Sequence, residues 1–111
     1  MTIALILFAL AAVGGLTMAV IRLRGKPLPP MGLALAHGAA AAAGLIALLV
    51  AVKQSAPPVA TTALIVFLIA AAGGFVLFFS HLRKVALPIW LVAVHALVAV
   101  AAFVTLLVSV A

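Results

Sequence analysis

The chain contains no aspartate, no glutamate and no cysteine. Without carboxylates it lacks the acid–base pairs on which hydrolytic sites depend, and proton-coupled exporters also generally use a membrane carboxylate. Without cysteine it can form neither disulfides, thiolate nucleophiles nor iron–sulfur clusters. Charged residues make up only 5% of the 111 residues, against about a quarter in a soluble domain. These absences argue against a soluble fold and against hydrolytic or transferase chemistry.

Hydrophobic residues, in contrast, make up 71% of the chain. A helix needs roughly 20 apolar residues to cross a hydrocarbon core, and the chain offers such stretches at Thr2–Ile21, Met31–Val52, Val59–Ser80 and Pro88–Val110. The first stretch has no basic region before it and no cleavage site after it, so we expect a retained helix rather than a signal peptide. Short loops impose an up-down order. We therefore predict one domain over residues 1–111, an all-α integral membrane bundle of four transmembrane helices.

Basic residues are distributed unequally among the loops. The loops Arg22–Pro30 and His81–Leu87 hold five lysines and arginines, whereas the loop Lys53–Pro58 holds only Lys53. Loops rich in lysine and arginine stay in the cytoplasm. We expect a multi-pass protein of a bacterial inner membrane with both termini outside. Because topology explains the net charge of +6, no nucleic-acid partner is expected.

The two halves of the chain resemble one another. Residues 4–24 match residues 63–83 at 10 of 21 positions, and residues 30–52 match residues 88–110 at 9 of 23. The matches include Gly-Gly, Leu-Arg, proline and histidine, which low complexity does not explain. We therefore expect two parallel-repeat helical hairpins, residues 1–53 and 59–111, related by a pseudo-two-fold axis along the membrane normal.

The duplicated histidines, His37 and His95, each follow a proline by seven residues. At 1.5 Å per residue both lie roughly 10 Å inside the membrane on the cytoplasmic side. Their helices run in the same direction and are diagonal partners in an up-down bundle, so the imidazoles face each other. Zinc sites need three or four protein ligands, whereas haem iron needs only two axial ones. The pair therefore predicts one haem b, with His37 and His95 as its iron ligands.

Other residues at matching depths fit the same hypothesis. Glycines on the remaining two helices remove side chains at the level of the histidines, which makes space for a flat macrocycle: Gly14, Gly15, Gly73 and Gly74. Cations towards the cytoplasmic face can pair with its propionates, since no side-chain carboxylate competes for them: Arg22, Arg24, Arg83, Lys84 and, at the end of the third helix, His81.

The repeated Gly-Gly, Leu-Arg, proline and histidine pattern resembles that of small uncharacterised bacterial four-helix membrane proteins. It is also similar to the b-type cytochromes of the b561 kind, whose histidines clamp haem across a bundle. The resemblance implies that His37 and His95 are axial ligands and that the cytoplasmic-side arginines bind propionates. The larger cytochromes hold two haems, but here the outer half contains no histidine. A single haem near one face suits electron exchange with a quinone, superoxide or a redox protein, or haem storage and delivery.

Two alternatives remain open at this stage. In the first, the protein is a cofactor-free structural or interaction module, and the histidines form hydrogen bonds between helices. The small residues of 38–44 would then serve close packing, within the bundle or in an oligomer. In the second, the protein is a small transporter, a class that the missing carboxylate and the parallel repeats disfavour.

Overall fold

The computed structural model describes all residues, 1–111, and consists of four helices without strands. Their bounds are α1 (Thr2–Leu23), α2 (Met31–Lys53), α3 (Pro58–Leu82) and α4 (Ile89–Val110). By length and composition, each is able to cross a membrane. The prediction of an all-α chain with four helices of this kind is confirmed.

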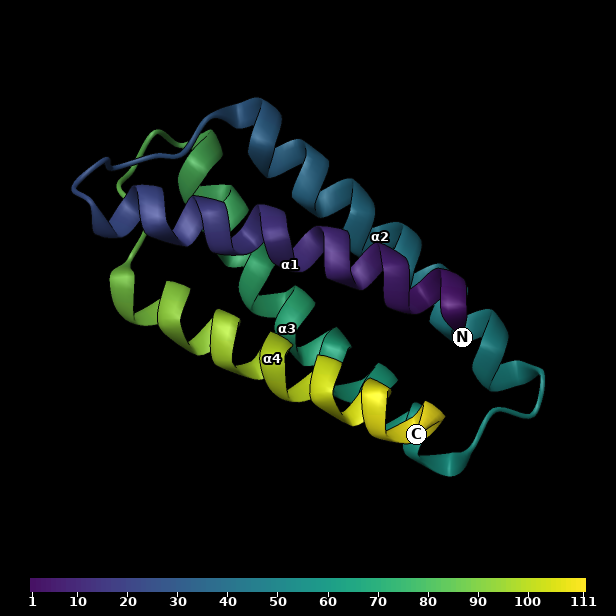
Figure 1. Ribbon diagram of the computed structural model, residues 1–111. Helices are drawn as coiled ribbons and strands as arrows, with labels where there is room; N and C mark the ends of the chain where they lie inside the picture. Colours follow the sequence, from purple (N-terminus) through teal and green to yellow (C-terminus); the bar gives the residue numbers. More distant parts are fainter.

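The helices form an antiparallel bundle in which α1 packs mainly on α2, and α3 mainly on α4 (Figure 1). Smaller contacts between α2 and α3, and between α1 and α4, join the two pairs. Consequently α1 and α3 are one diagonal, and α2 and α4 the other. The loops 24–30 and 83–88 lie together at one end, and both termini lie at the other (Figure 1). The bundle is 43 Å long, enough to cross a hydrocarbon core of about 30 Å.

Two helices extend further than the sequence predicts. The apolar pattern ends α1 at Ile21 and α3 at Ser80, but both helices continue for two more residues. They end in matching Schellman motifs, in which Gly25 (φ 101°) and Lys84 (φ 54°) take the left-handed conformation after the last turn. Arg22 and His81 therefore belong to helical last turns and not to loops, which fixes where their side chains start.

Twelve of the 14 buried residues form pairs that correspond between the two halves of the sequence. These pairs are Ala4 and Ala63, Phe8 and Phe67, Ala11 and Ala70, Pro29 and Leu87, Gly44 and Ala102, and Leu48 and Leu106. The two phenylalanine rings stack on each other with centroids 3.7 Å apart and planes 3° from parallel. The two halves thus contribute equivalent side chains to one central core.

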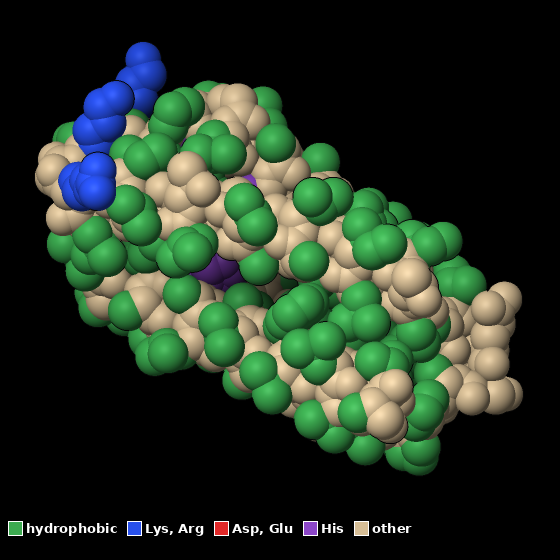
Figure 2. Space-filling view, in the orientation of Figure 1, with side chains coloured by type: hydrophobic (Ala, Val, Ile, Leu, Met, Phe, Trp, Pro, Cys, Tyr) green, Lys and Arg blue, Asp and Glu red, His purple; other side chains and the backbone are tan.

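Large apolar side chains cover the outside of the bundle (Figure 2). Only 14 of 111 residues are buried, and leucine, isoleucine and valine lie exposed on every helix. A soluble protein exposes contiguous apolar patches of at most a few hundred square ångströms. The surface is thus apolar in the way that contact with lipid requires.

Candidate haem-binding site

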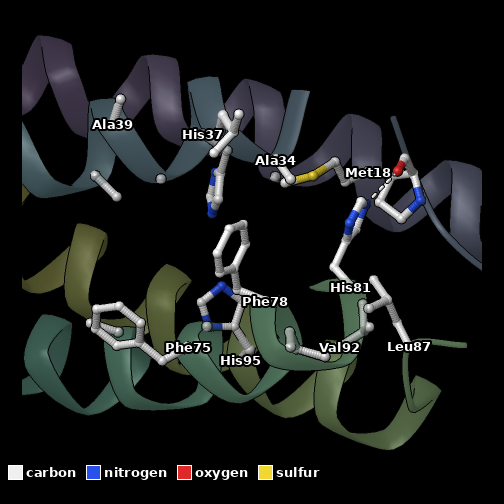
Figure 3. Close-up of a pocket in the computed structure, with 18 of the residues that line it drawn as sticks. Met18, Ala34, His37, Ala39, Phe75, Phe78, His81, Leu87, Val92 and His95 are labelled. Atoms are coloured by element: carbon white, nitrogen blue, oxygen red, sulfur yellow. Dashed lines mark hydrogen bonds between the residues drawn. The ribbon is translucent and has the colours of Figure 1, made fainter. Parts of the chain in front are cut away.

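His37 on α2 and His95 on α4 point toward one another across the middle of the bundle (Figure 3). Their ring centroids lie 6.2 Å apart, and their ring planes are 83° from parallel. Both side chains are half-buried and reach cavities on either side of them. The structure therefore brings together the two residues that the sequence singles out.

Each imidazole is held by a backbone carbonyl of the neighbouring helix. The Nδ1–H of His37 donates to Ala11 at 2.7 Å, and that of His95 donates to Ala70 at 2.8 Å. A carbonyl can only accept, so Nδ1 carries a proton, and in the neutral ring the lone pair is on Nε2. Metal-binding histidines are commonly oriented by such a bond from the non-ligating nitrogen. Both rings are thus held in the tautomer and orientation that metal ligation needs.

The four glycines lie against the histidine of their own half of the chain. A Cβ atom on Gly15 would stand 2.9 Å from Cε1 of His37, and one on Gly74 would stand 3.1 Å from Cε1 of His95. At Gly14 and Gly73 the nearest histidine atoms would be 3.6 and 3.7 Å away. Because glycine has no side chain, each imidazole fits between the two packed helices of its own half. The sequence did not predict this role for the glycines.

Two cavities adjoin the histidine pair. The larger has a volume of about 500 Å³ and extends from His37 and His95 towards the loop end, mainly between α2 and α3. The smaller, about 150 Å³, lies beside Phe8, Phe67 and Phe103 towards the end with the termini. On the face formed by α1 and α4, opposite the larger cavity, a histidine is visible in a hollow (Figure 2). The larger volume is within the usual 300–1,000 Å³ of small-molecule sites.

The cations that the sequence offers as propionate partners do not line either cavity. Arg24, Arg83 and Lys84 are exposed at the loop end, where blue side chains gather in Figure 2. Arg22 uses its Nε–H to bind the carbonyl of Leu87 at 2.8 Å, and Leu87 itself lines the larger cavity. The basic residues therefore surround the loop end of the site without contacting its interior.

His81, in contrast, is buried and lines the larger cavity (Figure 3). Its Nε2–H donates to the carbonyl of Pro29 at 2.6 Å. In the two halves of the chain, Arg22 corresponds to His81 and Leu87 to Pro29, so the two side chains make equivalent bonds to opposite loops. The sequence correspondence indicates a shared position, but only the structure reveals this contact.

The structure offers a metal two imidazoles and no group of three ligands, because His81 does not join His37 and His95. No family model, curated protein or solved structure matches the chain.

Proposed function

We propose that the protein is a membrane b-type cytochrome that binds one haem b between α2 and α4, with His37 and His95 as axial ligands. The main support for this proposal is the distance between the two imidazole rings. A metal–histidine bond of about 2 Å and roughly 1.1 Å from nitrogen to ring centre place two opposed axial imidazoles about 6.2 Å apart. The observed separation of the ring centroids is also 6.2 Å.

The surroundings of the histidines suit the same cofactor. Apolar side chains and glycines make up most of the lining of both cavities, which suits the apolar faces of a porphyrin. The carbonyls of Ala11 and Ala70 increase the basicity of the imidazoles and keep them oriented. Bound haem supplies one-electron chemistry between ferric and ferrous iron. Because His37 and His95 together would leave the iron no open coordination site, electron transfer would be favoured over oxygen activation.

The proposed location is a bacterial inner membrane, crossed by two duplicated hairpins. Five lysines and arginines are at the end formed by loops 24–30 and 83–88, while Lys53 is at the other. This asymmetry supports a cytoplasmic position for the first end and an outer position for both termini. The haem would then lie nearer the cytoplasmic face, where a quinone, superoxide or a redox protein would exchange electrons with it.

A visible spectrum of the detergent-purified protein, oxidised and then reduced with dithionite, tests the proposal. We expect a Soret band that shifts on reduction and sharp α and β bands, typical of low-spin bis-histidine iron. H37A and H95A should each abolish this spectrum. T17V is a matched control, since Thr17 is exposed and bonds only to Val13 of its own helix. If both histidine variants keep the bis-histidine spectrum, the ligand assignment is wrong.

One observation favours a cofactor-free structural module as the second candidate. The bonds from His37 to Ala11 and from His95 to Ala70 already link each pair of helices. Under this alternative the purified protein stays colourless when haem is added, and H37A and H95A change only stability or assembly.

A further inference from the structure

His81 is the one buried side chain of the protein that is polar or charged, with 8% of its surface exposed. One ring nitrogen, Nε2, is bound to the carbonyl of Pro29. The other, Nδ1, is buried and has no hydrogen-bond partner. A buried polar atom without a partner is destabilising, so the position requires an explanation.

The bond to Pro29 restricts which partner Nδ1 can take. A carbonyl only accepts, so Nε2 carries a proton. Neutral His81 then presents a lone pair at Nδ1 and needs a donor, whereas protonated His81 presents an N–H and needs an acceptor. A carboxyl group serves both states, as COOH with the neutral ring and as COO⁻ with the cation.

The chain itself contains no aspartate or glutamate that could supply this group. The other titratable groups of this half of the bundle, the basic side chains of the two loops and the paired histidines, are cationic or neutral. They are Arg22, Arg24, Lys26, Arg83, Lys84, His37 and His95. A carboxyl group near His81 must therefore come from a ligand, and the positive loop end favours an anion there.

His81 also lies on the appropriate side of the iron ligands. It follows Gly74, which contacts the ring of His95, by seven residues on α3, a rise of roughly 10 Å towards the loops. All three histidines line the same cavity (Figure 3). The cavity that His37 and His95 line thus reaches His81 on its loop side.

We propose that Nδ1 of His81 binds a carboxyl group of the molecule in the larger cavity, and that this group is a propionate of the haem. The inference rests on the proposed function and adds to it the means by which the site recognises the acidic edge of the porphyrin. The exposed cations cannot make this contact from inside the cavity, because they do not line it.

Binding of haem and of its dimethyl ester, in which both carboxyl groups are blocked, tests the proposal. We expect the wild-type protein to bind haem about tenfold or more tightly than the ester, because a hydrogen bond to a charged group raises affinity by about this factor. In H81L this preference should fall about tenfold, because Nδ1 is absent. The bis-histidine spectrum should remain unchanged, which separates loss of the carboxyl contact from loss of ligation. T17V should retain the wild-type preference.

H81F serves where H81L fails to fold, because its ring fills the place of the imidazole but carries no nitrogen. Its preference for haem over the ester should also fall. Equal binding of both porphyrins by the wild type, or an unchanged preference in the folded His81 variants, would overturn the inference and leave the cytochrome proposal standing. If the wild type binds neither porphyrin, both proposals are wrong.

Discussion

Replacement of Gly15 by alanine tests whether the histidine site depends on close approach of α1 to α2. The added Cβ would stand 2.9 Å from Cε1 and 3.2 Å from Nδ1 of His37, closer than carbon atoms pack. The imidazole cannot rotate away freely, because Nδ1 is bound to the carbonyl of Ala11 at 2.7 Å. Either the ring shifts and this bond weakens, or α1 separates from α2.

The expected cost follows from these two effects. Overpacking a close contact costs about 1–3 kcal/mol, and a weakened hydrogen bond adds about 0.5–1.5 kcal/mol. Replacing glycine by alanine within a helix returns up to about 1 kcal/mol. We expect G15A to lose about 1–3 kcal/mol, roughly five- to 150-fold in haem affinity where the loss falls on His37.

Haem titration and thermal unfolding in detergent measure this loss, and two glycines provide controls. A Cβ on Gly32, which lines neither cavity, meets nothing within 4 Å, and one on Gly14 meets His37 only at ordinary contact distance, so G32A and G14A should remain close to wild type. In the double variant G15A/H37A the clash is absent, so G15A should no longer reduce stability there. If G15A matches G32A in affinity and unfolding temperature, the packing argument is refuted.

Three further predictions concern the cap, the core and the topology. K84G should raise stability by about 0.5–1 kcal/mol, because residue 84 has a φ of 54°; thermal unfolding measures the gain, and a loss would contradict it. F67A should cost about 3–5 kcal/mol by removing the stack on Phe8, and an F8A/F67A cycle without coupling would contradict the stacking. In this cysteine-free chain, K26C should react with an impermeant thiol reagent only from the cytoplasmic side and S55C only from outside; the reverse pattern would overturn the proposed orientation.

The sequence predicts the helices well because length and apolarity decide them. Proline before α2, α3 and α4 marks their starts, and glycine at position 25 marks the end of α1. The end of α3 is harder to predict, since the corresponding residue is Lys84, whose side chain gives no sign of a left-handed conformation. α1 and α3 thus continue past the residue at which the sequence turns polar, because backbone hydrogen bonds extend the last turn of each helix beyond it.

At the histidine site, the internal duplication predicts which side chains face one another, but not which groups hold these side chains in place. The matched positions of His37 and His95 are sufficient to expect a pair across the diagonal. The carbonyls of Ala11 and Ala70 carry no side-chain signal, so their bonds to the imidazoles cannot be read from residue types. The partner of His81 is likewise a backbone atom, that of Pro29.

The differences between the two halves explain why the larger cavity lies between α2 and α3. On α2 this cavity is lined by Ala34, Gly38 and Ala42, whereas the corresponding positions on α4 carry the larger Val92, Ala96 and Val100. Smaller side chains leave more space on the α2 side, even though the histidines and their carbonyl partners are equivalent in both halves. The cavity is therefore larger on that side, where His81 also lines it. The duplication provides two equivalent histidines that face one another, and its departures from symmetry provide one larger cavity beside them.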